Sequence, residues 1–204
     1  MSESKLYKTL VAILRPIFKL IYRLEIKGVD NIPKKGKAIL CPNHTSNADP
    51  ILLAVSLNRQ VFFMAKKELF SKKILSKFFK ALGSFPVDRG SGDSSALEQS
   101  KKILKNNNLL GIFIEGSRSK TGEFLRPKTG AALIAADTLS DIIPIYIRCV
   151  DGGKIRAFKK NILIIGKALS NNDLNLIDKT GKSFRDASRT IMENIKKLGV
   201  NINK

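Results

Sequence analysis

Residues 37–50, KAILCPNHTSNADP, contain the transition that decides the fold. The stretch begins with an apolar run of strand character, Lys37–Cys41, and continues into a polar turn. Asp49 followed by Pro50 then indicates a helix start, because proline is favoured at the first helical position, where its missing N–H is not needed. The stretch therefore predicts a strand, a turn and a helix in direct succession.

The same alternation extends along the rest of the chain. Further strands are predicted at Val61–Ala65, Ser84–Val87, Leu110–Ile114, Ile142–Arg148 and Ile162–Gly166, and Leu24–Lys27 is expected to add an edge strand. Helical patterns lie at Ile51–Asn58, Glu68–Leu82, Ser94–Asn106, Gly130–Leu139 and Phe184–Leu198, the last opened by a capping box of Ser183 and Asp186. Such alternation is typical of α/β domains. We predict a single α/β domain, residues 25–204, with a mixed, largely parallel sheet flanked by helices.

Residues 1–24 precede this domain and carry an amphipathic helical pattern. On a helical wheel, leucine and isoleucine fill one side, and a sector of about 80° on the other holds Lys5, Lys8, Arg15, Lys19 and Arg23. This pattern suits a helix in the headgroup region of an anionic bilayer, although the apolar side could instead pack on the domain. Pro16 is expected to kink or divide the helix. No cleavable signal and no apolar stretch of about 18 residues is found, so we expect a peripheral or monotopic protein at the cytoplasmic face of the cell membrane.

The composition points to a polyanionic partner. The net charge is +20, from 37 Lys and Arg against 17 Asp and Glu, which suits nucleic acid, an anionic membrane, an acidic carrier protein or phosphate-bearing substrates. Cys41 and Cys149 each end an apolar run and are expected to be buried free thiols. With one histidine and no CxxC pair, the chain lacks the ligands of a zinc site, and we predict no metal.

His44, the only histidine, follows the first strong strand, and Asp49 lies five residues later. In a turn that leaves a strand, the aspartate can fold back on the imidazole, and a carboxylate-held histidine is a familiar general base. Imidazole suits proton transfer because its unperturbed pKa of about 6.5 is close to neutral pH. The alternative is that Asp49 caps the helix and His44 is merely polar.

Cationic side chains follow two other predicted strands. Lys66 and Lys67 come directly after Val61–Ala65, where an ammonium group can reach a phosphate or simply be solvated. Arg89 follows Ser84–Val87 and can either bind an anion or pair with the adjacent Asp88.

A polar turn, Glu115, Gly116, Ser117 and Arg118, follows the strand Leu110–Ile114. Glycine lets the backbone approach a ligand closely, and the guanidinium fork of Arg118 matches phosphate. Glu115 can accept hydrogen bonds from alcohol groups. Neither a P-loop nor a GxSxG elbow is present, so Ser117 is a poor nucleophile candidate.

Taken in order, these segments resemble the glycerolipid acyltransferase family, and within it the 1-acylglycerol-3-phosphate acyltransferases. The matching positions are NHxxxxD at Asn43, His44 and Asp49, the AK-x-EL lysine Lys66, GxxxVDR at Gly83 to Arg89, EGSRS at Glu115 to Ser119, and the strand proline Pro144. The resemblance covers roughly residues 24 to 167, and Ser117 stands where the family usually has threonine.

The resemblance implies a reaction and a role for each residue. His44, oriented by Asp49, would deprotonate the sn-2 hydroxyl of 1-acyl-sn-glycerol 3-phosphate, a lysophosphatidic acid. The alkoxide would attack the thioester of acyl-CoA or acyl carrier protein and give phosphatidic acid, with no cofactor. Arg118 and Lys66 would hold the acceptor phosphate, with Arg89 a weaker candidate. Glu115 would contact the glycerol or shape the pocket, alongside Gly116 and Ser117.

Three alternatives remain open at this point. A sister acyltransferase would use glycerol 3-phosphate or another lysolipid as the acceptor. A nucleic-acid-binding domain would fit the charge, but the chain has no Trp, only 3 Tyr and no recognised binding motif, so we expect no nucleic-acid partner. An inactive membrane protein is the third alternative, and the intact set of His44, Asp49, Glu115 and Arg118 argues against it.

Overall fold

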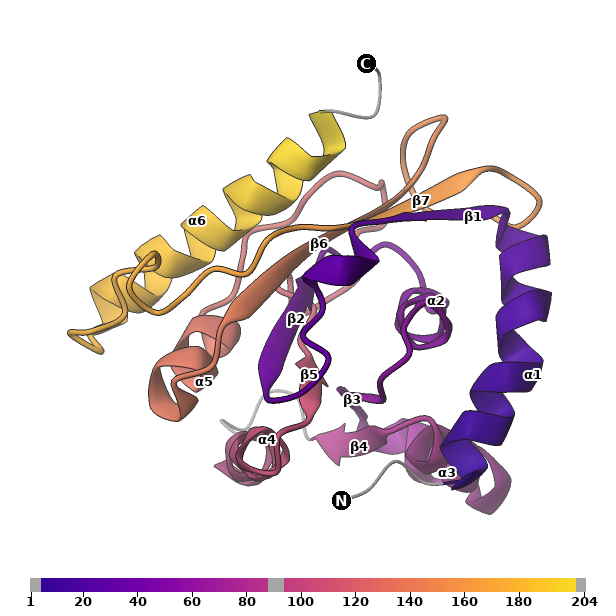
Figure 1. Cartoon of the computed structure of the whole chain (residues 1–204), viewed down its shortest axis with the longest axis horizontal. Helices are drawn as coiled ribbons and strands as arrows, with labels where there is room; N and C mark the ends of the chain where they lie inside the picture. The colour runs from indigo at the N-terminus through magenta and orange to yellow at the C-terminus, as the bar shows by residue number, and fades with distance from the viewer. Residues whose placement is uncertain (1–4, 88–93, 201–204) are drawn as a thin grey trace.

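The computed structural model describes residues 5–87 and 94–200, and within them seven strands form one sheet (Figure 1). In spatial order the strands are β1 (Leu24–Lys27), β7 (Asn161–Ile165), β6 (Ile142–Cys149), β2 (Ala38–Pro42), β5 (Leu109–Gly111), β3 (Val61–Lys66) and β4 (Ser84–Val87). The five strands from β6 to β4 are parallel, whereas β7 is antiparallel to β6, and β1 is parallel to β7. The predicted mixed, largely parallel sheet is confirmed, with β1 at an edge.

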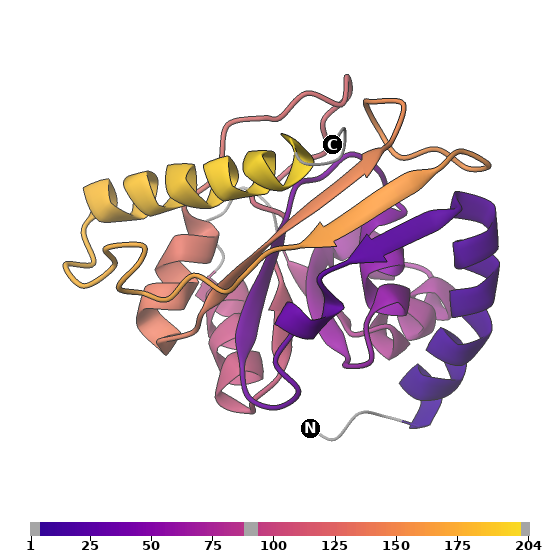
Figure 2. The ribbon, with the colours of Figure 1, turned by 45° about the horizontal axis from the view of Figure 1, so that its top comes forward.

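Helices cover both faces of the sheet, as Figures 1 and 2 show. One face is covered by α1 (Lys5–Tyr22) and α2 (Asp49–Ser56), and the other by α4 (Ser94–Lys105), α5 (Gly130–Thr138) and α6 (Gly181–Val200). The central strand β2 is buried throughout, and its side chains alternate between the two layers. Ala38 and Leu40 pack toward α2, and Ile39 and Cys41 toward α5 and α6. This double burial explains why the sequence of β2 is continuously apolar.

The predicted helix Glu68–Leu82 is two separate elements. The 3-10 helix η2 (Lys67–Phe70) ends at Ser71, and α3 (Lys73–Ala81) begins after Lys72, whose backbone is extended. Both the N–H and the hydroxyl of Ser71 donate to the carbonyl of Glu68, at 3.3 and 2.8 Å. A serine that bonds the local backbone in this way competes with helix continuation, which explains the break.

The last helix begins earlier than its sequence pattern predicts. The predicted box of Ser183 and Asp186 is wrong, because the reciprocal bonds join Thr180 and Ser183. The N–H of Thr180 donates to Oγ of Ser183 at 3.0 Å, and the N–H of Ser183 donates to Oγ1 of Thr180 at 3.1 Å. The arrangement is a capping box in which serine replaces the usual glutamate, so α6 starts at Gly181.

The N-terminal segment is one helix, so of the two predicted effects of Pro16, a kink or a division, the division is wrong. The proline leaves the carbonyl of Ala12 without its helical donor, but both residues are exposed, and water can satisfy that group. Tyr7 and Val11 are buried, and Phe18 and Tyr22 pack against the core. In the described part of the chain, no helix combines the length and apolar character needed to cross a bilayer.

Arg15 does not belong to an outward basic stripe, in contrast to the wheel-based prediction. Its Nε donates to the carbonyl of Val55, and its Nη2 to the carbonyl of Leu57, both at 2.7 Å. These carbonyls lie at the C-terminal end of α2, where a cation is favoured by the helix dipole. Arg15 therefore joins α1 to α2 and leaves Lys5, Lys8 and Lys19 as the exposed basic residues of the stripe within α1.

Both cysteines are free and buried, as predicted. Burial raises the pKa of the Cys41 thiol, because the apolar surroundings disfavour the thiolate.

Candidate active site

The chain leaves the sheet after β2 through an asparagine that is anchored to β6. Nδ2 of Asn43 donates to the carbonyl of Ile147 at 3.0 Å, and the N–H of Ile147 donates to Oδ1 of Asn43 at 2.8 Å. The side-chain amide thus replaces a backbone unit in the ladder. This anchor fixes the backbone immediately before His44 at the carboxyl end of the parallel strands, where ligands bind in α/β sheets.

His44 and Asp49 are in direct contact. Nδ1 of His44 lies 2.9 Å from Oδ2 of Asp49, and the same oxygen accepts the N–H groups of Thr45 at 2.6 Å and Ser46 at 2.8 Å. Asp49 is fully buried, and His44 is 8% exposed. A carboxylate at Nδ1 places the ring hydrogen there and leaves the Nε2 lone pair free to accept a proton. The predicted pair is therefore present, and the alternative in which His44 is merely polar loses support.

Phe113 stacks on the imidazole, which sequence reasoning did not predict. The two ring centroids are 3.9 Å apart with an interplanar angle of 24°, and Phe63 of β3 stacks behind Phe113 at 6.1 Å. The bond to Asp49 fixes one edge of the ring and Phe113 fixes its face, so His44 is held in one orientation. The one sequence feature that could have indicated this contact is the apolar run Gly111–Ile114, which contains Phe113 and leads directly into the polar turn.

Glu115 connects two loops and is nearly fully buried. Its Oε1 accepts the N–H of His44 at 3.0 Å, and its Oε2 accepts the N–H of Leu125 at 2.9 Å. Burial raises the pKa of the Glu115 carboxyl, and the two backbone donors partly oppose this shift. Because both oxygens are occupied by backbone groups, the geometry favours a pocket-shaping role over a contact with glycerol.

The turn that follows Glu115 is held against His44. The N–H of Ser119 donates to the carbonyl of His44 at 2.9 Å, so both backbone groups of His44 are bound by this turn. Gly116 has a positive φ of 68°, a backbone conformation that glycine adopts without strain. Ser117 is exposed. Segments 71 positions apart in the sequence thus form one unit.

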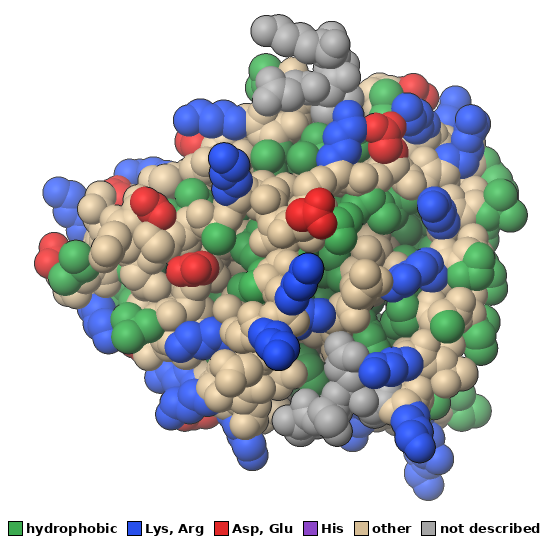
Figure 3. Space-filling view, viewed as in Figure 1, with side chains coloured by type: hydrophobic (Ala, Val, Ile, Leu, Met, Phe, Trp, Pro, Cys, Tyr) green, Lys and Arg blue, Asp and Glu red, His purple; other side chains and the backbone are tan. Residues whose placement is uncertain are grey.

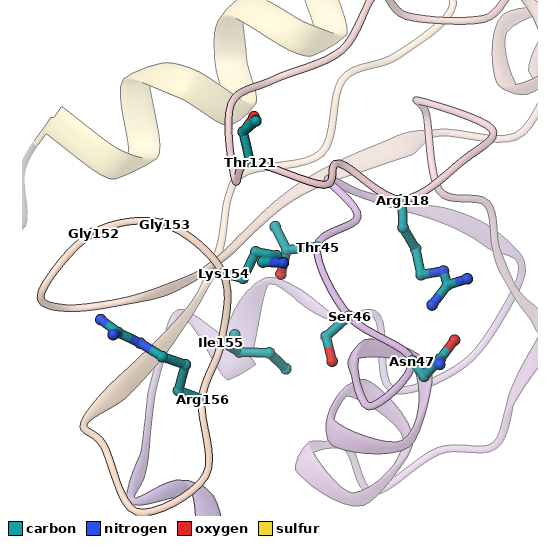
Figure 4. Close-up of a pocket in the computed structure, with 10 residues that line it drawn as sticks. All are labelled: Thr45, Ser46, Asn47, Arg118, Thr121, Gly152, Gly153, Lys154, Ile155 and Arg156. Atoms are coloured by element: carbon teal, nitrogen blue, oxygen red, sulfur yellow. The ribbon is translucent and has the colours of Figure 1, made fainter.

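Arg118 lines a pocket of about 630 Å³ beside this unit (Figure 4). The other lining residues are Thr45, Ser46 and Asn47 of the His44 turn, Thr121, and residues 152–156 of the β6–β7 connection. Lys66 is exposed at the carboxyl end of β3, on the same edge of the sheet, but it does not line this pocket. Arg89 lies outside the described residues. Among the side chains that the structure describes, no group of three His, Cys, Asp or Glu is placed to hold a metal ion.

A histidine–carboxylate pair beside a cationic pocket, at the carboxyl ends of parallel strands, defines a site that can deprotonate a hydroxyl group near an anion. The acyltransferase family model matches residues 23–148, and the chain belongs to this family.

Two relatives are each named 1-acyl-sn-glycerol-3-phosphate acyltransferase. The Bacillus subtilis protein is 33% identical over 171 residues, which are 82% of this chain and 84% of the relative. The Streptococcus pneumoniae protein is 35% identical over 121 residues, which are 58% of this chain and 44% of the relative.

The fold is also shared with a solved structure. The 1-acyl-sn-glycerophosphate acyltransferase PlsC of Thermotoga maritima superposes with a TM-score of 0.72 at 23% identity. The match covers 96% of this chain and 82% of that protein.

Proposed function

We propose that this chain transfers an acyl group from an acyl thioester to the sn-2 hydroxyl of 1-acyl-sn-glycerol 3-phosphate, which gives phosphatidic acid. Membership of the acyltransferase family and the names of the relatives support acyl transfer to this acceptor. The observation that carries the chemistry is the 2.9 Å contact between Nδ1 of His44 and Asp49, which leaves Nε2 as the proton acceptor.

In the proposed reaction, Nε2 of His44 removes the proton of the hydroxyl as its oxygen attacks the thioester carbonyl. The tetrahedral intermediate then expels the thiolate, and the imidazolium returns its proton to the sulfur, so His44 ends neutral. Asp49 stabilises the imidazolium between these steps. Acyl-CoA or acyl carrier protein is the proposed donor, and the net charge of +20 suits either one. The reaction requires neither a metal nor an organic cofactor.

Arg118 is the proposed main ligand of the acceptor phosphate, because it lines a pocket built partly from the His44 turn. Lys66 would approach the acceptor from the end of β3, and Gly116 and Ser117 would line its path. Binding the charged headgroup away from the reacting atoms places the hydroxyl in attack geometry.

We also propose that the protein docks on the cytoplasmic face of the cell membrane as a peripheral or monotopic protein. Support comes from α1, on which Leu6, Ile13, Ile17 and Leu20 are 46 to 79% exposed. Figure 3 shows hydrophobic side chains gathered along the edge of the molecule that α1 occupies, with basic side chains nearby. Apolar side chains combined with lysines suit an anionic bilayer. We propose no nucleic-acid partner.

The reaction is tested with purified protein, labelled acyl-CoA or acyl carrier protein, and three acceptors: 1-acyl-sn-glycerol 3-phosphate, glycerol 3-phosphate and a lysolipid with a larger headgroup. We expect labelled phosphatidic acid with at least one donor and none with His44→Ala. If only glycerol 3-phosphate gave a product, it would be the acceptor in place of the proposed one. If no combination of donor and acceptor gave a product, the proposed reaction would be refuted.

A further inference from the structure

The connection between β6 and β7 supplies two cations to the wall of the pocket that Arg118 lines. Lys154 and Arg156 belong to residues 152–156, which form one side of this pocket, as Figure 4 shows. The sequence identifies residues 151–153 as a turn but gives the cations behind it no role. The carboxyl end of β6 lies next to that of β2 because the two strands pair in parallel, and this pairing brings Lys154 toward the His44 turn.

The β6–β7 connection is held in place around Lys154. A Cβ added to Gly122 would lie 2.7 Å from Cα of Gly153, so this loop touches the backbone of the loop that carries Arg118. On the other side of Lys154, Ile155 is 5% exposed and packs in the core. Oδ1 of Asn161 accepts the N–H of Arg156 at 3.0 Å, and Nδ2 of Asn161 donates to the carbonyl of Arg156 at 2.8 Å. The backbone on both sides of Lys154 is therefore preorganised.

The cations of this pocket differ from other cations of the same connection. Lys159 pairs with Asp151 at 3.6 Å, and Lys160 pairs with Glu25 at 2.8 Å. By contrast, no ion pair links Arg118 or Lys154 to a described acidic side chain, and no aspartate or glutamate lines the pocket. Cations that line one polar cavity repel each other, and a bound anion relieves that repulsion.

We propose that Lys154 and Arg118 together bind a phosphate group in this pocket, so that Lys154 helps to determine specificity for phosphorylated substrates. The proposal rests on the proposed acyl transfer and extends its binding site to the β6–β7 connection. The phosphate can come from the headgroup of the acceptor or from the phosphopantetheine arm of the donor. In either case the anion sits beside Thr45, Ser46 and Asn47, next to the residue that accepts the proton.

Equilibrium binding tests this site without relying on turnover. In a His44→Ala background, binding of 1-oleoyl-glycerol 3-phosphate, 1-oleoylglycerol and coenzyme A is measured in nonionic detergent. We expect Lys154→Gln to raise the Kd of the phosphorylated acceptor about tenfold, because a charge-assisted hydrogen bond is lost. The Kd of 1-oleoylglycerol should stay unchanged. Lys154→Arg should restore most of the affinity. The matched control is Lys159→Gln, which changes a cation of the same connection that does not line the pocket.

The outcomes separate the two sources of phosphate. A selective loss of acceptor affinity assigns the pocket to the headgroup, and a selective loss of coenzyme A affinity assigns it to the donor. If Lys154→Gln keeps its affinity for both within twofold, or weakens 1-oleoylglycerol equally, the proposal is overturned. Binding is measured in inactive protein, so it does not depend on turnover. An absence of acyl transfer in the wild type would refute the proposed reaction but would not change the binding result for Lys154.

Discussion

At the scale of single residues, the position of His44 depends on contacts with Asp49, Phe113, Glu115 and Ser119. Asp49 fixes the ring hydrogen, Phe113 fixes the ring plane, and the other two residues bind the backbone of His44. The orientation of the imidazole and the position of its loop are thus fixed by different residues. Substitutions of Asp49 and Glu115 should therefore have different effects on turnover and on stability.

Asp49→Asn should lower kcat by about a thousandfold or more, with a change in acceptor KM of less than about threefold. The N–H groups of Thr45 and Ser46 hold the amide oxygen in the place of Oδ2, so it still accepts from Nδ1. The neutral amide, however, no longer stabilises the imidazolium, and a close ion pair is worth roughly 4 kcal/mol at an effective dielectric constant of about 20. Initial rates at varied acceptor concentration measure both constants, with circular dichroism as the folding control. A kcat within tenfold of the wild type would contradict the role of Asp49.

Glu115→Gln should lower the free energy of unfolding by about 1–3 kcal/mol, because one of the two backbone N–H groups that donate to Glu115 loses its acceptor. Urea denaturation measures this change. The exposed carboxylate Glu123 belongs to the same loop, and Glu123→Gln is the control, with an expected change of at most about 0.5 kcal/mol. Equal stability of the two variants would show that Glu115 does not connect the loops.

The strand pattern and the family resemblance together pointed to His44, Asp49 and Arg118, and the structure places His44 in contact with Asp49 and Arg118 at the neighbouring pocket. It could not show that both oxygens of Glu115 face backbone donors, since that depends on how the loop around Leu125 returns to the His44 turn. The stacking of Phe113 was equally hidden. A phenylalanine in an apolar run predicts burial, and only the chain path shows that its neighbour is the histidine.

At the scale of elements, strand and helix types followed from the periodicity, whereas boundaries depended on local polar groups. β1 and β4 agree with their predicted bounds, but Ser71 interrupts one helix, and the box of Thr180 and Ser183 starts another early. The sequence also could not show which basic residues of α1 bind another helix and which are exposed to solvent. Arg15 and Lys19 are one helical turn apart, and only the position of α2 distinguishes them.

Arg15→Gln and Lys19→Gln should therefore produce opposite results. Arg15→Gln removes two charge-assisted bonds to α2 and should reduce the free energy of unfolding by about 1–3 kcal/mol, with vesicle binding retained. Lys19→Gln should leave stability unchanged and weaken binding to vesicles with anionic lipid a few-fold. Urea denaturation and vesicle flotation measure the two properties. The assignment of these residues fails if both variants lose the same property.

At the scale of the whole molecule, the C-terminal end of α1 lies at the active-site edge of the sheet. β1 begins beside the end of β6, because Leu24 pairs with Asn161, and Asn161 pairs with Cys149. The carbonyl of Ile21 accepts the N–H of Phe158 at 2.6 Å, and the carbonyl of Tyr22 accepts Nδ2 of Asn161 at 2.6 Å. The helix proposed to meet the membrane is thus bonded to the connection that lines the Arg118 pocket.

This arrangement predicts that the exposed apolar residues of α1 affect activity according to their distance from that edge. Leu20 is 79% exposed near the C-terminal end of α1, and Leu6 is 58% exposed near the N-terminal end. With acceptor embedded in anionic vesicles, Leu20→Ser should lower the rate about tenfold and Leu6→Ser less, because only Leu20 adjoins Ile21, whose carbonyl is bonded to the connection that lines the pocket. With acceptor dispersed in detergent, both variants should match the wild type, since neither side chain contacts the site. If Leu20→Ser loses equal activity in detergent, the effect belongs to folding and not to the membrane. If both variants keep full activity on vesicles, α1 does not deliver the site to the bilayer.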